Sequence, residues 1–273
     1  MDFPVETKRQ KCTIGFMIET HKPENIRIIV IDPLKPNTVY ANGSIVVTGK
    51  DYFYVRMPIS PDKALVRIIN DKNGNIKNDS TFRYQYKLMP LKTNLNAFNY
   101  HNPQILSFIN FISEFANNAG ILSAGNVSIF LSNDAEFRIH FVDEIKDENG
   151  NVFNTPARIS KINNRIEFNR AQIANYTVPA IVAIGLHEFG HGYLNREKSN
   201  EIEADYNALR IYLGLGFSRK EAFRIFCKVF AGSPSRLNEL RLQKIENFIM
   251  RFEKEPSINY QYYYVGENGE KAA

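Results

Sequence analysis

Two histidines and a glutamate in the second half of the chain have the residue types and spacing of a metal-dependent hydrolytic site. His187, Glu188 and His191 form the pattern H-E-x-x-H. On an α-helix, residues four apart project from one face, so both imidazoles can reach one ion. Glu188 lies beside them and can pass a proton from an activated water to a leaving amine. Two core histidines would give the same pattern, so other residues must support the chemistry.

A hydrolytic zinc site needs a third protein ligand and one open coordination position. Glu201 follows His191 by ten residues and opens the segment E-I-E-A-D, which ends at Asp205. Glu201 and Asp205 are four apart and share a helix face, whereas Glu203 points about 200° away from Glu201. We expect residues 195–200 to fold this helix back, so that Glu201 binds zinc and Asp205 accepts a histidine N–H. An acidic first helical turn, favoured by the helix dipole, is the structural alternative.

The two segments together resemble a known family. H-E-F-G-H followed by E-I-E-A-D is similar to the H-E-x-x-H…E-x-x-x-D signature of gluzincin metallopeptidases, most of all the HtpX and CaaX-protease branch. The resemblance covers about Ser123 to Glu255 and implies a zincin-like fold, with Zn²⁺ on the two histidines and Glu201 and with Glu188 as general base. It also implies an edge strand, expected at Arg165–Phe168, that pairs with an extended peptide substrate. The transmembrane helices of that branch are missing, which implies a soluble, minimal version.

Two other residues compete for the place of third ligand. Glu197 follows His191 by six residues, as in metzincins, but Leu194 stands where that family has glycine. No methionine turn of that family follows either. Asp205 itself is the ligand that an aspzincin-like site would use. Glu201 is the preferred ligand of the three.

The oxyanion of a tetrahedral intermediate needs a hydrogen-bond donor besides the metal. The sequence does not choose among four candidates by residue type: Tyr193, Tyr206, Arg210 and His140.

Composition indicates a folded, water-soluble protein. The chain has 273 residues, 44% hydrophobic and 23% charged, with a net charge of +5. Its longest basic cluster is Lys8–Lys11, which gives no strong nucleic-acid signature. No apolar run approaches the ~20 residues of a membrane span, the best candidate being Val178–Leu186. With no visible signal peptide and two isolated thiols, Cys12 and Cys227, we expect a cytoplasmic protein, with association to a phage or virion left open.

The first ninety residues alternate short β-branched or aromatic runs with turn signals. Turns are expected at residues 22–25, 32–33, 41–43 and 73–75. Short strands with such punctuation predict an all-β, sandwich-like module over residues 1–92. A partner-binding role and a purely structural role fit this module equally well. The six expected strands are 12–19, 26–31, 44–47, 52–57, 64–69 and 82–88.

A second, α+β domain is expected over residues 93–258. Asn102-Pro103 starts a helix that should end at Gly120. Strands follow at 127–131 and 137–142, then a hairpin of 157–161 and 165–168. Residues 176–255 carry helical periodicity, with Ser218 and Ser235 as caps. Residues 259–273 should form a final strand or a tail.

These features predict a soluble zinc metalloendopeptidase that acts on a protein or peptide substrate. Two alternatives remain. The chain could be a structural or virion-assembly protein that keeps a zincin domain as a scaffold, because a fold does not imply a function. It could also be a regulatory protease that cleaves one specific partner.

Overall fold

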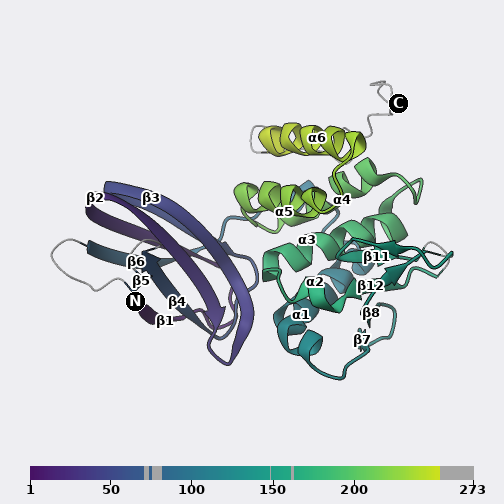
Figure 1. Cartoon of the computed structure of the whole chain (residues 1–273), viewed down its shortest axis with the longest axis horizontal. Coiled ribbons are helices and arrows are strands. Elements are labelled where there is room, and N and C mark those ends of the chain that lie inside the picture. Colours follow the sequence, from purple (N-terminus) through teal and green to yellow (C-terminus); the bar gives the residue numbers. More distant parts are fainter. Residues whose placement is uncertain (71–73, 76–81, 148, 161–162, 253–273) are drawn as a thin grey trace. The chain divides into compact units, whose positions relative to one another are not determined.

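The chain is described from a computed structural model, which covers residues 1–70, 74–75, 82–147, 149–160 and 163–252. The described part is mixed α+β with several sheets (Figure 1). It divides into two compact units: Met1–Lys92 with Thr177–Pro179, and the remainder of the chain. The strand or tail expected over residues 259–273 lies outside the described residues.

The first unit is built on one antiparallel sheet. Its strand order is β1-β4-β2-β3, with β5 paired to β4 and β6 paired to the first half of β2. The long strand β2 therefore has β3 along one edge, while β6 and β4 share its other edge. The strands are β1 (Asp2–Glu6), β2 (Cys12–Asp32), β3 (Lys35–Met57), β4 (Lys63–Asn70), β5 (Gly74–Asn75) and β6 (Phe82–Pro90).

Two of the turns expected in this unit are wrong. The segments 22–25 and 41–43 lie inside β2 and β3, which form one long hairpin that turns at Pro33 and Leu34. The polar residues near Pro23 produce a register shift between Thr20 and Glu24 instead of a reversal. A bulge of this kind accommodates a proline within a strand because the ladder is already interrupted there. All-β structure is therefore present in this unit, but as one sheet and not a sandwich, and its strands β2 and β3 are far longer than the strands expected there.

Every second side chain along each half of β2 is buried, and these side chains form the core of this unit. In the first half of β2, Ile14, Phe16 and Ile18 are buried, and in the second half Ile26, Ile28 and Val30 are buried. Successive residues of a strand point to opposite faces, so the other face of the sheet remains for polar or exposed side chains.

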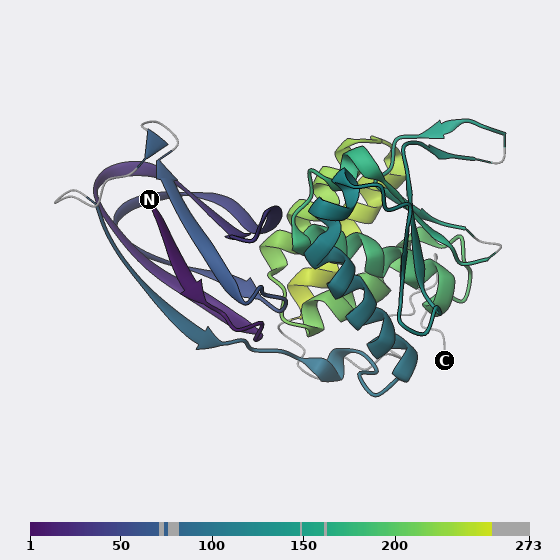
Figure 2. The same ribbon diagram turned by 90° about the horizontal axis from the view of Figure 1, so that it is seen from below.

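The second unit packs helices against a small sheet of order β11-β12-β8-β7, in which β12 and β8 are parallel. Figure 1 shows α3 between α1 and the pair α5 and α6, and Figure 2 shows the same unit from below, with α1 in front of the other helices. The strands are β7 (Ile129–Leu131), β8 (Arg138–Val142), β9 (Ile145–Lys146), β10 (Val152–Phe153), β11 (Ala157–Ile159) and β12 (Ile166–Asn169). The helices are η1 (Leu95–Ala97), α1 (Pro103–Ala124), α2 (Arg170–Ile173), α3 (Val178–Phe189), η2 (Gly190–Leu194), α4 (Glu201–Gly214), α5 (Arg219–Ala231) and α6 (Arg236–Phe252).

Helix α1 is the central core helix of this unit. Asn102 caps it through its side chain, as expected, but the helix continues past Gly120 to Ala124. Phe108 stacks on Phe189 of α3 with ring centroids 4.2 Å apart, and Phe115 contacts Phe168 of β12. Among the described residues, α1 alone is long and apolar enough to cross a membrane, a test that buried core helices also pass.

Candidate metal centre

Helix α3 carries His187, and the turn η2 that continues it carries His191, from the core of the second unit to a cavity. The residues of α3 from Val178 to Leu186 are all buried, and all of them except Gly185 have apolar side chains. Gly185 permits close packing on α1, because a Cβ there would lie 2.3 Å from Cδ1 of Ile112. The helix then widens into the π-helical turn η2, closed by the bond from Asn195 N–H to Gly190 O (2.8 Å). Such turns occur often at functional sites.

Helix α4 brings the acidic residues to the histidines. Asn200 caps it by accepting the backbone N–H of Glu203 (3.0 Å). The turn η2 crosses α4 closely at Gly190, where a Cβ would lie 3.2 Å from the Cα of Ala204. Residues 195–200 thus fold α4 back on α3, and Glu201 lies at its first position.

The nitrogen and oxygen atoms of three residues converge. Nε2 of His187 lies 3.1 Å from Nε2 of His191, and these nitrogens lie 3.4 and 3.5 Å from the carboxylate oxygens of Glu201. Ligands placed tetrahedrally at ~2.0–2.2 Å from one zinc ion are about 3.3–3.6 Å apart. The two distances to Glu201 end on different oxygens, Oε2 for His187 and Oε1 for His191, and one ligand atom from each of the three residues lies within 4.8 Å of the others. The three side chains therefore converge at about the spacing that one tetrahedral ion requires.

The far nitrogens of both rings are engaged, which fixes the role of the near ones. Nδ1 of His191 lies 2.7 Å from the carbonyl oxygen of Lys198 and donates its proton there. Nδ1 of His187 lies 3.0 Å from Oδ1 of Asp205, a close contact without ideal hydrogen-bond alignment. With both protons on Nδ1, two Nε2 lone pairs face one another at 3.1 Å. That arrangement is repulsive unless a positive charge lies between them, either a second proton on His187 or a metal ion, and the donor set fits a metal.

The electrostatics of the cluster also favour a cation. Burial lowers the pKa of His187, but the carboxylates of Asp205 and Glu201 outweigh it and raise that pKa to about 10. Burial raises the pKa of Glu201, but the two imidazoles and Arg241 bring that pKa well below its usual range. The carboxylates thus remain charged and attract positive charge to the histidine nitrogens.

Glu188 lies next to the cluster in a different environment. It is 7% exposed, and burial raises the pKa of its carboxyl above the usual value. The two imidazoles and a hydrogen bond from the backbone N–H of Ile159 partly offset this effect. A carboxylate with a raised pKa is suited to both accepting and releasing a proton.

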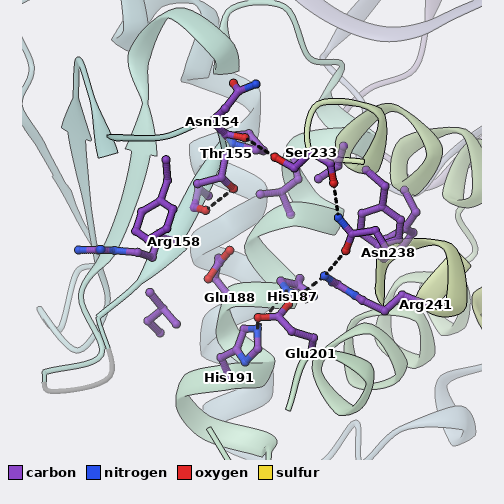
Figure 3. Close-up of a pocket in the computed structure, with 18 of the residues that line it drawn as sticks. Asn154, Thr155, Arg158, His187, Glu188, His191, Glu201, Ser233, Asn238 and Arg241 are labelled. Carbon is purple, nitrogen blue, oxygen red and sulfur yellow. Dashed lines mark hydrogen bonds and ion pairs between the residues drawn. The ribbon is translucent and has the colours of Figure 1, made fainter. Parts of the chain in front are cut away.

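These side chains open into a cavity of about 670 Å³ within the second unit (Figure 3). One wall is β11 with the segment before it, and the opposite wall is apolar, formed by Ala183 and Ile184 of α3 and by α5. The edge strand beside the cavity is β11, Ala157–Ile159, because β12 pairs with β11 on one side and β8 on the other. The expectation that Arg165–Phe168 is the edge strand is therefore wrong. The α5 side chains are Ile225, Phe226, Val229 and Phe230.

Arg241 of α6 is a site residue that the sequence analysis missed. Its guanidinium binds Asp205 through two contacts of 2.8 and 2.9 Å, and lies 3.1 Å from Glu201. It also donates to Asn238, which in turn donates to the carbonyl of Ser233 (Figure 3). The available signal was its position: Arg241 begins the buried stripe of α6 that continues through Ile245. An arginine on such a stripe needs a buried partner.

None of the four oxyanion candidates lines the cavity. Tyr193 stacks on Phe189, and Tyr206 stacks on Phe248. Arg210 is buried one turn beyond Tyr206, and His140 lies on β8. The donors that line the cavity come from other elements: Arg241 and Asn238 of α6, Ser233, Asn154, Arg158 and Lys198.

The competing acidic residues lie outside the cluster. Glu197 accepts a hydrogen bond from Ser199 and does not line the cavity. Glu203 accepts the backbone N–H of Arg196, on the side of α4 away from Glu201. Asp205 is 1% exposed and contacts His187 and Arg241, which places it behind the three converging side chains.

Comparisons of the chain with protein-family models, with curated proteins and with solved structures found no match.

Proposed function

We propose that the chain is a zinc-dependent endopeptidase of zincin-like fold, with the metal on His187, His191 and Glu201. The observation that carries this proposal is the approach of their ligand atoms to 3.1–3.5 Å around one point. When bound, zinc would supply Lewis acidity and lower the pKa of a water molecule to ~7. Asp205 and the carbonyl of Lys198 would hold the two rings with Nε2 toward the metal.

Glu188 would act as general base and then as general acid. Its carboxylate lines the same cavity as the three ligands and can move one proton from the attacking water to the leaving amine. Its burial supports this role, because burial stabilises the neutral form that the residue must pass through.

The substrate would be an extended peptide lying along β11. Within the β11–β12 pair, Pro156 accepts from Asn169 and Ser160 donates to Arg165, so residues 156, 158 and 160 pair with β12. The backbone groups of Ala157 and Ile159 therefore point the other way, where Ala157 O accepts from the Thr155 hydroxyl and Ile159 N–H bonds Glu188. The Ala157 N–H and the Ile159 carbonyl are the groups that a peptide would pair with. An extended peptide can add to such an edge, and the apolar wall of α5 would accept an apolar side chain.

The proposal is tested by metal content and turnover in matched variants. Wild type and Glu203→Gln should carry near-stoichiometric zinc by mass spectrometry, whereas Glu201→Gln should lose it. Glu188→Gln should keep zinc but lower casein turnover by at least about 100-fold, the scale of general acid–base catalysis.

Two results would count against this function. A wild-type protein that cannot be loaded with zinc would show that the histidines only serve packing. Zinc binding with no turnover, unaffected by Glu188→Gln, would favour the scaffold alternative over the peptidase.

A further inference from the structure

One face of the sheet in the first unit exposes two neighbouring tyrosines. Tyr52 and Tyr54 are two residues apart on β3, so both rings point to the same side of the sheet. They are 56% and 60% exposed, while Phe53 between them points to the other side and stacks on Phe16 of the core. Adjacent large aromatic side chains left in solvent mark a contact surface rather than a core.

The same face carries four cations around these rings. Lys50 and Arg56 flank the tyrosines on β3. Through β2, the register aligns Lys50 with Arg83 of β6 and Tyr54 with Lys87 of β6. We call this set the basic aromatic face; its residues are Lys50, Tyr52, Tyr54, Arg56, Arg83 and Lys87.

The cations of the basic aromatic face have no ion-pair partner among the described residues; Lys50 lies 5.8 Å from the centre of the Tyr52 ring. Glu19, aligned between Lys50 and Arg83, is the one carboxylate in these rows. Elsewhere in the described part of the unit, three acidic residues pair with cations: Asp2 with Arg67, Glu6 with Lys63, and Glu24 with Lys22. Four cations and the one carboxylate of Glu19 leave this face with a formal charge of +3.

The two parts of the chain also differ in their net charge. Residues 1–92 hold 15 of the 34 Lys and Arg but only 9 of the 29 Asp and Glu, a formal charge of +6. The remaining residues carry −1. Charge asymmetry between two parts of a chain points to an anionic partner for the basic part.

The orientation of the Tyr54 ring leaves one of its two faces open to a stacking partner. A Cβ on Gly15 of β2 would lie 3.3 Å from the Tyr54 ring, so this ring lies over the glycine and leaves its other side to solvent. The two tyrosines are roughly 6.6–6.8 Å apart along the strand. Planar groups can stack on rings presented like this.

We propose that the basic aromatic face binds single-stranded nucleic acid, with bases stacked on Tyr52 and Tyr54 and phosphates on the surrounding cations. Single strands combine exposed planar bases with a regular anionic backbone, and stacking platforms between cations are how proteins bind them. A duplex hides its bases, an acidic peptide offers few rings to stack, and an anionic membrane needs no aromatic platform. This proposal is independent of the peptidase site.

The test is fluorescence anisotropy of the full-length protein with labelled oligothymidylate and oligouridylate of about 20 nucleotides. Tyr52→Leu/Tyr54→Leu should weaken binding about ten-fold or more, whereas Tyr52→Phe/Tyr54→Phe should bind as wild type does. Leucine still covers Gly15, and thermal unfolding confirms that each variant is folded. Lys87→Glu should weaken binding and reduce the slope of log K against log salt by about 0.7 or more. Lys63→Gln, which removes a cation already paired with Glu6, is the matched control.

Three results would overturn the proposal. The first is no binding of either oligonucleotide at low salt. The second is equal affinity in wild type and the leucine variant, which would reduce the effect to attraction between opposite charges. The third is tighter binding to polyglutamate or to phosphatidylserine vesicles than to the oligonucleotides, which would assign the face to an acidic protein or a membrane.

Discussion

At the scale of single residues, the buried pair of Asp205 and Arg241 holds the cluster together. Asp205 contacts His187 on one side and receives two bonds from Arg241 on the other. Arg241 also reaches Glu201 and lies over the ring of Phe230. One guanidinium therefore positions two carboxylates: Glu201, which converges on the proposed metal site, and Asp205, which contacts His187.

We expect Arg241→Met to weaken zinc binding about 10- to 100-fold, because the ligand-orienting contacts are lost. It should also destabilise the second unit by ~3–5 kcal/mol, because Asp205 would lose its guanidinium partner while its charge stays buried. Competition with a chromophoric chelator measures the first effect and urea unfolding the second.

Arg236→Met, an exposed arginine on the same helix, is the matched control and should change neither quantity. Equal zinc affinity in Arg241→Met and wild type would remove Arg241 from the site.

At the scale of elements, the site depends on how closely η2 and α4 cross. Gly190 lies between Glu188 and His191 in sequence, and its missing side chain lets the backbone of α4 approach at Ala204. The neighbour there is backbone, which cannot move aside as a flexible side chain can. The separation of the two helices therefore sets the distance from the histidines to Glu201.

Gly190→Ala should push α4 away and cost ~1–3 kcal/mol of stability. The same shift should weaken zinc binding, because Glu201 moves with the first turn of α4. Differential scanning fluorimetry with and without zinc checks both effects. Gly125→Ala, at a position with negative φ and no contact shorter than 3.4 Å, should behave as wild type. A fully stable, zinc-binding Gly190→Ala protein would contradict this account of the crossing.

At the scale of the whole molecule, each unit has its own core. The first is buried on one face of its sheet around Ile14 and Phe16, and the second around the aromatic side chains of α1 and α3. All the converging ligand atoms belong to the second unit. Zinc binding should therefore raise the stability of the second unit and leave the stability of the first unit unchanged.

Calorimetry of the full chain should show two unfolding transitions. Zinc at 100 times its dissociation constant should stabilise one of them by ~2.7 kcal/mol and leave the other unchanged. Ile14→Ala should lower only the transition that zinc does not move, by ~2–5 kcal/mol, because it leaves a cavity in the first unit. A single transition that both changes shift would show that the units unfold together.

The sequence by itself determined the features that depend on local periodicity. The four-residue spacings of His187 with His191 and of Glu201 with Asp205 place each pair on one helix face, and the loop between them is short. The approach of the two histidines to Glu201 was therefore predictable. The helix caps Asn102 and Ser235 are local too and are confirmed, although Ser218, also expected as a cap, makes no side-chain cap bond.

Only the tertiary structure decided what depends on residues distant in sequence. Arg241 reaches Asp205 from 36 positions away, on a different helix. The order of strands, which makes β11 the edge instead of β12, follows from the pairing of β12 with β8 and not from any local pattern. The cations of the basic aromatic face form no basic run, because β3 and β6 meet on the same face only through their shared partner β2. Side-chain periodicity specifies which face of an element is buried, but the packing of whole elements specifies which faces meet.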